Sequence, residues 1–351
     1  MSTGGDIIFT YFLAMLSILI MIISTIRQFF PNSIIKDAAL KFPITQEGWA
    51  VDMPNEKECR FDEPDFWLIL NLQDMLTGGW GKMPHELKQI HDYYQSWAPL
   101  DRIIVVVWPM GLSNAWPDES FHVIEFSTHQ YETWQSYKEQ EDVLRDAFSV
   151  DKKEYEFNFL CMNRIKKPHR QIIYDRLSTF AEGNCSLQTA GHELKYSGID
   201  LKTYDDKYNN LDNLLSLKKA FNTSFFSVVS ESQYAEQYGI ITEKTFNAIV
   251  AGHPFMLCAH GGAVSQVKEL GFKTWGNLFS ELYDEVLGNN RIDDMIFDNL
   301  SWFDTKISSS DMHDLYMLHR DTIDYNRNFF FEEFGDNQIA WLRAQLLNVW
   351  N

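Results

Sequence analysis

The most informative stretch of the sequence is Ile240-Ile-Thr-Glu-Lys-Thr-Phe-Asn-Ala-Ile-Val-Ala-Gly-His-Pro-Phe-Met-Leu-Cys258. Its pattern predicts one short helix followed directly by a buried strand. Thr242 is a suitable N-cap, because its hydroxyl can accept a hydrogen bond from an unpaired backbone N–H of the first turn. Apolar residues then recur with helical spacing, Gly252 suits the left-handed position after the helix, and Pro254 prevents continuation. The apolar run Phe255–Cys258 is typical of a strand inside a parallel sheet.

Two charged residues, Glu243 and Lys244, lie on the first turn of this predicted helix. The amino end of a helix carries unpaired N–H groups and positive potential, so it can bind a phosphate. A lysine there can pair with a second phosphate oxygen, and a carboxylate can accept hydrogen bonds from sugar or ribose hydroxyls. The spacing alone favours a simpler interpretation, in which Glu243 interacts with the helix dipole and Lys244 is solvated.

Composition limits the classes of function. The 351 residues suffice for two domains of ordinary size, and the net charge of −19 argues against nucleic acid as a partner, because binding it needs clustered Lys and Arg. The four cysteines, Cys59, Cys161, Cys185 and Cys258, show neither a C-x-x-C pair nor a zinc spacing. A reducing compartment fits them best, and a single Cys59–Cys185 bridge is the alternative.

An uncharged run of 20 residues, residues 7–26, lies between Asp6 and Arg27. As a helix it would span roughly 30 Å, the thickness of the hydrocarbon core of a bilayer. The run is too long for a signal peptide and its amino-terminal flank is not basic, so it predicts a single-pass membrane anchor, with a buried core helix as the alternative. Arg27, Lys36 and Lys41 follow the span, and the positive-inside rule therefore places the large carboxyl-terminal part in the cytoplasm.

Alternating strand and helix patterns predict two α/β domains after the anchor segment, residues 1–30. Residues 31–150 form the first, which begins as an irregular stalk and has its clearest strand at Arg102–Trp108. Residues 151–305 form the second, a doubly wound domain, and residues 306–351 close the chain as helices.

Other local predictions are less specific. Phe66–Leu72 has a length that suits either a strand or the start of a helix. The patterns of Gln130–Phe148 and Met312–Asn326 each predict one helix, and Ser186–Thr189 a short strand.

Polar side chains follow three predicted strands of the second domain. Residues 163–170 hold Asn163 and a basic cluster that ends with Arg170, the turn Ser230-Glu-Ser232 follows a second strand, and His260-Gly-Gly262 follows a third. In open α/β sheets, ligands bind beyond the carboxyl ends of the strands. Cations for a diphosphate and carboxylates for hydroxyls are what a nucleotide-diphosphate sugar requires there.

The segments Ser227-Val-Val-Ser-Glu-Ser232 and Ile241-Thr-Glu-Lys-Thr-Phe-Asn-Ala-Ile-Val-Ala-Gly-His-Pro-Phe255 resemble the donor-binding core of GT-B glycosyltransferases, most closely that of α-fucosyltransferases and their viral and bacterial relatives. That family has a Glu-Asn-Ser turn after a strand, then Thr-Glu-Lys, an aromatic residue, Asn-Ala, Ala-Gly and Pro. The likeness covers residues 155–275. This chain has one residue fewer between its Lys and Asn and between its Gly and Pro, and Ser232 replaces an Asn.

The resemblance implies two Rossmann-like domains that face a cleft, with the nucleotide sugar bound in the second domain. Arg170 and Lys244 would then hold the diphosphate. Glu243 would hold sugar or ribose hydroxyls, and Glu231 would help to shape the donor pocket. Asn163 matches, loosely, an Asn on the first strand of that domain in the family.

The activity that the resemblance implies is transfer of a sugar to a hydroxyl of a glycan or other acceptor, commonly without a metal or other cofactor. Arg170, Lys244 and Lys167 would stabilise the departing diphosphate by preorganised charge. A general base would come from the first domain, where Glu125 at a strand end is the first candidate and His129 the second. The simpler interpretations are an exposed strand-end carboxylate for Glu125 and a surface or core histidine for His129.

Other classes of protein fit the sequence less well. A metal-dependent GT-A transferase needs Asp-x-Asp, and the chain offers only the adjacent pairs Asp205-Asp206 and Asp293-Asp294. Neither a P-loop nor a Gly-x-Ser-x-Gly elbow occurs. Two alternatives stay open: a membrane-anchored binding or structural protein with a glycosyltransferase-like fold and no turnover, and a Golgi-lumenal type II topology, which cellular α-fucosyltransferases often have.

Overall fold

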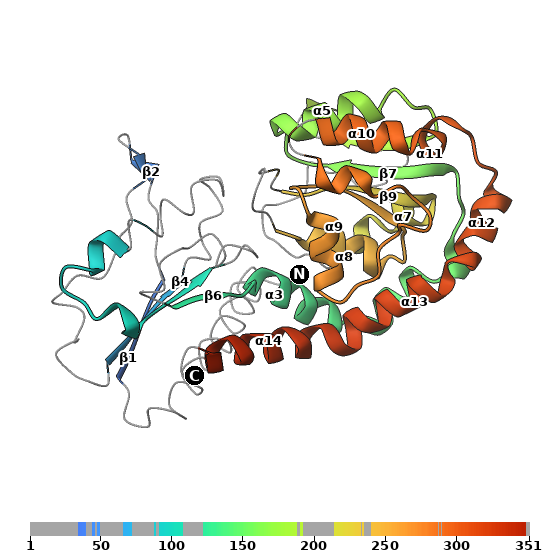
Figure 1. Ribbon diagram of the computed structural model, residues 1–351. Coiled ribbons are helices and arrows are strands. Elements are labelled where there is room, and N and C mark those ends of the chain that lie inside the picture. The colour runs from blue at the N-terminus through green and yellow to red at the C-terminus, as the bar shows by residue number, and fades with distance from the viewer. Residues whose placement is uncertain are drawn as a thin grey trace. The chain divides into compact units, whose positions relative to one another are not determined.

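The computed structural model describes most of the chain from residue 122 onward and shorter segments before it (Figure 1). The described residues are 34–39, 44–45, 48–49, 66–71, 88, 91–107, 122–187, 190–191, 214–232, 234, 240–286, 288 and 290–348. They belong to two compact units, one of residues 132–335 and one of residues 8–131 with 336–351.

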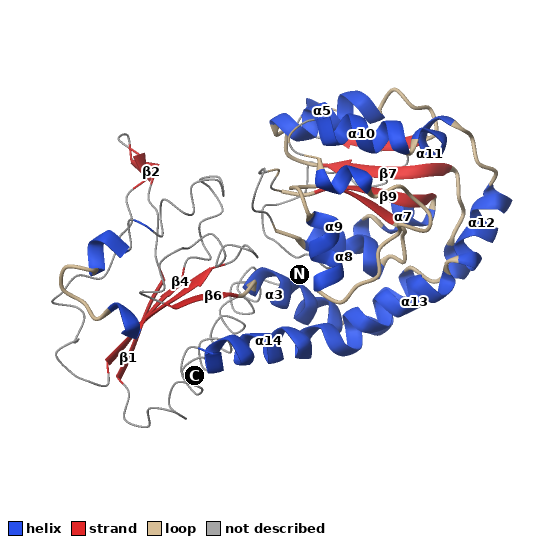
Figure 2. Cartoon of the chain, viewed as in Figure 1, coloured by secondary structure: helices blue, strands red, loops and turns tan. Residues whose placement is uncertain are grey.

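The described strands are β1 (Ile34–Ala39), β2 (Ile44–Thr45), β3 (Gly48–Trp49), β4 (Phe66–Asn71), β5 (Ile103–Val107), β6 (His122–Glu125), β7 (Phe157–Asn163), β8 (Gly183–Leu187), β9 (Ser224–Ser230) and β10 (Phe255–Cys258). Two four-stranded sheets result, with the orders β1-β4-β5-β6 and β10-β9-β7-β8, and β2 pairs with β3. Every pairing within the two four-stranded sheets is parallel. The chain is therefore a mixed α/β protein with two parallel sheets (Figure 2).

The described helices are α3 (Thr128–Lys138), α4 (Glu141–Ala147), α5 (Pro168–Leu177), α7 (Lys218–Asn222), α8 (Glu243–Val250), α9 (Ala263–Glu269), α10 (Asn290–Asp298), α11 (Leu300–Asp304), α12 (Ser309–Leu318), α13 (Arg320–Phe329) and α14 (Gly335–Asn348). Short 3₁₀ turns occur at η2 (Leu100–Arg102), η4 (Val150–Lys152) and η7 (Leu282–Glu285), and a π-helical turn, η8 (Phe330–Phe334), follows α13.

The strand order of the second sheet decides where a ligand can bind. The chain passes from β7 to its neighbour β8 on one side and then returns to β9 and β10 on the other side. Right-handed crossovers in opposite directions put helices on opposite faces, and α5 and α8 indeed cover opposite faces of this sheet (Figure 1). The carboxyl ends of β7 and β9 thus form a topological switch point, the usual position of a ligand crevice.

The stretch at residues 240–258 folds as its pattern predicts. The Thr242 hydroxyl caps α8 by accepting from the Lys244 backbone N–H at 3.5 Å. Gly252 has φ of 65°, and β10 occupies the predicted residues. Every residue of β9 and β10 is buried, which explains the continuous apolar run of β10 and the mix of apolar residues and small serines in β9.

Some local predictions are wrong, and long-range packing explains the differences. The residues at 34–39, expected in an irregular stalk, form β1, because β4 supplies their hydrogen-bond partners. The ambiguous segment at 66–72 is the strand β4. The strand expected at Ser186 begins earlier, at Gly183, where a Cβ atom would lie 2.2 Å from the Phe159 ring.

Two segments that were expected to be single helices are each divided. The first becomes α3 and α4, which are separated at Glu139 and Gln140. The second becomes α12 and α13, which meet at His319, whose φ and ψ of −99° and 9° break the helical path. All four helices contain buried residues, so burial continues across both breaks.

The predicted membrane anchor, residues 7–26, lies outside the described residues. Within the part of the chain that the structure describes, no helix has the length and apolar character needed to cross a bilayer. Cys161 and Cys258 are buried free thiols. The alternative of a Cys59–Cys185 bridge stays a prediction. Cys59 itself lies outside the described residues.

Candidate functional site

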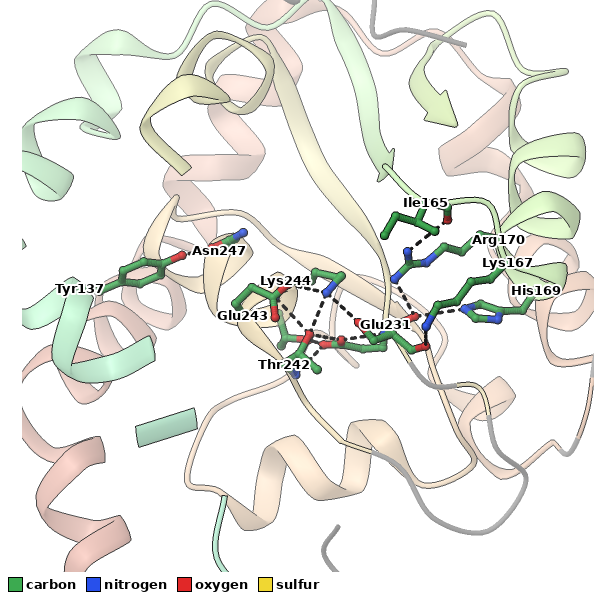
Figure 3. A network of polar contacts seen from close by, with 12 residues as sticks. Tyr137, Ile165, Lys167, His169, Arg170, Glu231, Thr242, Glu243, Lys244 and Asn247 are labelled. Atoms are coloured by element: carbon green, nitrogen blue, oxygen red, sulfur yellow. Dashed lines mark hydrogen bonds and ion pairs between the residues drawn. The ribbon is translucent and has the colours of Figure 1, made fainter. Parts of the chain in front are cut away.

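The candidate site lies at the carboxyl edge of the second sheet, where β7 and β9 end side by side (Figure 3). Asn163 is the last residue of β7, and Ser230 is the last residue of β9. Helices α5 and α8 follow these two strands, and both start at this edge. Pro168 at the first position of α5 and the Thr242 cap of α8 explain locally why both helices begin here.

Glu231 joins β9 to the amino end of α8. Its side chain is fully buried, and Oε1 accepts from the Thr242 N–H at 3.0 Å and the Thr245 hydroxyl at 2.6 Å. Oε2 accepts from the Thr242 hydroxyl at 2.5 Å and the Ser232 N–H at 3.3 Å. Four donors thus occupy the carboxylate, which also lies at the positive end of the helix dipole. Glu231 therefore shapes the site by holding α8, and its carboxylate is not available to a ligand.

Lys244 and Glu243 are more accessible. The Lys244 ammonium donates to Ser232 Oγ at 3.0 Å, to Thr242 Oγ1 at 3.2 Å and to Glu243 Oε1 at 2.5 Å. The Lys244 and Glu243 side chains keep 26% and 24% of their surface exposed. Lys244 is therefore only partly solvated, and its charge is directed at the turn after β9.

Lys167 approaches the same turn from the other side. Its ammonium donates to the Ser232 carbonyl at 2.8 Å, so both lysines contact this one residue. Burial lowers the pKa of Lys167, and the charges of Arg170 and Lys244 lower it further. Lys167 therefore lies close to two further cations, and an anion placed there would relieve the repulsion that it experiences.

Arg170 is the most deeply buried of these cations, with 4% of its surface exposed. Nη1 donates to the Ile165 carbonyl at 3.3 Å, Nη2 donates to the Glu231 carbonyl at 3.5 Å, and Nε has no partner among the described residues. Burial lowers the pKa of Arg170, whereas the charges of Glu231 and Glu243 favour its protonated form. Among the described residues, the Arg170 guanidinium donates only to carbonyls, and burying a cation without a carboxylate acceptor is costly.

His169 packs against a second aromatic side chain at this edge. Burial lowers the pKa of His169 to about 4, so the ring is neutral at pH 7 and Nε2, which faces the Glu231 carbonyl at 3.2 Å, carries the proton. The ring stacks on Tyr234 with 5.2 Å between centroids and an interplanar angle of 9°. The Arg291 guanidinium carbon lies 5.4 Å from the centroid of the same Tyr234 ring.

Several buried side-chain atoms at this edge have no hydrogen-bond partner in the described part of the chain. They are Asn163 Oδ1, Arg170 Nε, Ser230 Oγ, His260 Nδ1 and Arg291 Nη2. Buried polar atoms are usually hydrogen-bonded, and each exception requires an explanation. These atoms belong to the ends of three neighbouring strands and to the first turns of α5 and α10. Donors and acceptors collected in this way suit a polar ligand.

The structure brings most of the predicted donor-site residues together. Arg170, Glu231, Glu243 and Lys244 lie in one polar network, and Asn163 lies at the neighbouring strand end (Figure 3). Sequence reasoning did not identify Arg291. Its guanidinium donates to the Ala259 carbonyl beyond β10. The only local signal in the sequence is that Arg291 lies at the start of a helix.

The predicted bases Glu125 and His129 belong to the other unit. Glu125 ends β6 and has 6% of its surface exposed, so the interpretation of an exposed strand-end carboxylate is wrong. Its backbone N–H donates to Gln345 Oε1 at 3.0 Å, and its carbonyl accepts from Gln345 Nε2 at 2.7 Å. His129 lies in α3 and is partly exposed.

Chemically, the edge of the second sheet offers charge stabilisation rather than acid–base catalysis. Lys167, Arg170 and Lys244 supply positive charge, whereas the Glu231 and Glu243 carboxylates are already hydrogen-bonded. An anion with several oxygens could use these donors at once. Comparison with protein-family models, with curated proteins and with solved structures found no match for this chain.

Proposed function

We propose that this protein is a glycosyltransferase of the GT-B type, which uses a nucleotide-diphosphate sugar as its donor. The observation that carries this proposal is the buried Arg170 guanidinium, which has no carboxylate partner among the described residues and lies at the switch point of a parallel sheet. The resemblance of residues 227–255 to the donor-binding core of α-fucosyltransferases supports a diphosphate as the bound group. The donor sugar is a hexose or fucose in this proposal, and the acceptor is a hydroxyl of a glycan or glycoconjugate.

The proposed role of the site is to stabilise the leaving group. When the bond between the sugar and the diphosphate breaks, negative charge accumulates on the phosphate oxygen. Arg170, Lys167 and Lys244 would stabilise this charge more strongly in the transition state than in the bound donor. A phosphate oxygen that accepts a hydrogen bond from the Lys244 ammonium would replace Glu243 as its partner. Glu243 could then accept a hydrogen bond from a hydroxyl of the nucleotide sugar.

The remaining parts of the proposal concern the other unit and the membrane. In a GT-B arrangement, two Rossmann-like domains face a cleft, and the acceptor-side domain supplies the base. Glu125, or His129 in its place, would accept the proton of the acceptor hydroxyl. We place the protein at a membrane through residues 7–26, with the catalytic part in the cytoplasm and the Golgi lumen as the alternative.

A second candidate is a binding protein with the same fold and no turnover. The hydrogen bonds of the two carboxylates at the carboxyl edge of the second sheet favour this candidate. Glu231 accepts four hydrogen bonds, and Glu243 is paired with Lys244 at 2.5 Å. No proton acceptor for chemistry is therefore evident within the described part of this edge.

Thermal unfolding of the full-length protein with UDP, GDP, ADP or CDP tests the donor site. We expect one nucleotide to raise the unfolding temperature, since a ligand at a hundred times its Kd stabilises by about 2.7 kcal/mol. This stabilisation should disappear in Lys244→Ala and in Arg170→Gln. Arg176→Ala is the matched control, because Arg176 lies on the same helix as Arg170 and pairs with Asp293 on the surface at 2.7 Å. Equal stabilisation of Lys244→Ala and Arg176→Ala, or no stabilisation by any nucleotide, would refute the proposal.

Turnover separates the transferase from the binding protein. The sugar conjugate of the stabilising nucleotide is incubated with the protein, and release of the nucleoside diphosphate is measured with and without EDTA. A transferase releases the nucleotide, and Glu125→Gln or His129→Asn should lower kcat by roughly 10²–10⁴-fold if that residue is the base. Binding without release would establish the non-catalytic alternative.

A further inference from the structure

A second group of buried cations lies at the opposite, amino-terminal edge of the same sheet. Lys153 precedes β7, and its ammonium donates to the Ala251 carbonyl at the end of α8 at 2.9 Å. Arg327 on α13 has 6% of its surface exposed. Its Nε and Nη2 atoms have no partner among the described residues, although both are buried.

Tyr316 is the common neighbour of these groups. Its ring centroid lies 5.9 Å from the Lys153 ammonium and 6.4 Å from the centroid of Tyr155. Its hydroxyl and Arg327 Cδ lie 3.0 Å and 3.7 Å from the position that a Cβ atom on Gly252 would occupy. The Tyr155 hydroxyl is buried and, within the described residues, has no partner. Donors that are unpaired within the described residues, from the loop before β7 and from α13, therefore gather near the last turn of α8.

Within the part of the chain that the structure describes, no carboxylate is bonded to Lys153 or Arg327. The carbonyl end of α8 carries partial negative charge, and Lys153 already uses the Ala251 carbonyl. Asp324, whose charge favours protonated Arg327, is bonded to Arg320 Nε at 2.7 Å. A buried cation without a hydrogen-bonded acceptor destabilises the fold, so this arrangement is more readily explained by a ligand than by stability.

We propose that the amino edge of the second sheet is a second anion-binding site, which takes a small oxyanion such as phosphate between Arg327, Lys153 and the Tyr155 hydroxyl. The two unpaired guanidinium atoms decide the ligand class. Nε and Nη2 lie on the same side of the planar guanidinium and can donate together to two oxygens of one oxyanion. Burial and the charge of Arg327 lower the pKa of Lys153, and a bound anion would favour its protonated form. The Tyr155 hydroxyl can donate to a third oxygen. This proposal does not depend on the proposed transferase activity.

Titration calorimetry of the full-length protein with inorganic phosphate in a chloride buffer tests the site. Because phosphate can also bind at the carboxyl edge, all measurements use the Lys244→Ala background. We expect one saturable phosphate site, whose Kd rises roughly tenfold or more in Arg327→Gln, since that change removes both charged donors. Arg320→Gln is the matched control, because Arg320 lies on the same helix and is paired with Asp324. It should leave the phosphate Kd unchanged.

Tyr155→Phe provides a second, milder variant that keeps the packing and removes only the unpaired hydroxyl. It should weaken phosphate binding severalfold, which keeps the proposal testable if Arg327→Gln does not fold. Absence of phosphate binding in the Lys244→Ala background would overturn the proposal, as would equal Kd values in the Arg320→Gln and Tyr155→Phe variants. In Arg327→Gln with Lys244 intact, a nucleotide should still raise the unfolding temperature. Failure of the phosphate-site proposal can therefore be distinguished from failure of the donor-site proposal.

Discussion

Glu231 and Arg170 show how burial decides the role of a charged side chain. Both follow strands of the second sheet in sequence, and both lie at its carboxyl edge. The Glu231 carboxylate accepts four hydrogen bonds, whereas Arg170 Nε donates to no acceptor among the described residues. The first side chain therefore stabilises the fold, and the second can donate to the proposed ligand.

Replacing Glu231 by Gln, a side chain of nearly the same size, should destabilise the protein. In Glu231→Gln, the new amide NH₂ group would face hydroxyl and N–H donors, so at least one buried group would lose its partner. We expect a loss of about 1–3 kcal/mol in the free energy of unfolding, measured by urea titration. The control Glu243→Gln breaks a partly exposed pair and should change stability by about 0–1 kcal/mol. Equal effects of the two variants would contradict the assigned role of Glu231.

His260 makes the stability depend on pH. Burial lowers the pKa of His260 to about 4, while an unfolded histidine has a pKa of about 6.5. Between these values the unfolded chain binds more protons than the folded chain, so stability is lost as the pH falls through this window. His260 should contribute about 3 kcal/mol to that loss by pH 4.

Urea titrations between pH 7 and pH 4 measure this contribution. His260→Gln should flatten the loss of stability relative to the unaltered protein. His313→Gln, in which an exposed histidine of α12 is replaced, should leave it unchanged. An identical pH dependence in the two variants would show that other groups cause the loss.

At the scale of elements, α8 connects the candidate site to the core. Its amino end is held by the Glu231 carboxylate, and its buried face packs on η8 and on the segment after α9. The Phe246 ring lies 5.4 Å from Phe330, 5.3 Å from Phe334 and 6.0 Å from Phe272, measured between centroids. This aromatic cluster fixes the position from which Lys244 reaches the turn after β9.

Removing the central ring of the cluster should be strongly destabilising. Phe246 is fully buried, so Phe246→Ala leaves a cavity that its aromatic neighbours cannot fill, and we expect a loss of about 3–5 kcal/mol in the free energy of unfolding. Phe297 on α10 has 79% of its surface exposed and provides the matched control. Phe297→Ala should change stability by less than about 0.5 kcal/mol, and a comparable loss would disprove the assignment of the cluster as core.

For the whole molecule, the distribution of charge matters more than its sum. The net charge is −19, yet cations that have no carboxylate partner among the described residues concentrate at both edges of the second sheet. A uniformly acidic surface would repel phosphate, and buried local cations can attract it because solvent screens them less. The chain can therefore combine an unfavourable overall charge for nucleic acids with specific sites for small anions.

Residues 7–26 should hold the full-length protein in a membrane after alkaline carbonate extraction. The double variant Leu16→Arg, Leu19→Arg should release it, because each arginine at the centre of a span costs about 2.5–3.5 kcal/mol. Leu16→Ala, Leu19→Ala is the control and should remain bound. Release of the unaltered protein would show that these residues are not an anchor, and protease protection in vesicles would distinguish the cytoplasmic from the lumenal orientation.

Local sequence was sufficient for α8, β10 and β5, because caps, apolar periodicity and glycine or proline stops act within a few residues. It was also sufficient to propose Arg170, Glu231 and Lys244, since each follows a strand or begins a helix. It was not sufficient for β1, whose hydrogen bonds come from β4, or for Arg291 and Arg327, whose neighbours are distant in the chain. Strand order and the burial of individual charges depend on the packing free energy of distant segments, which no short window of residues contains.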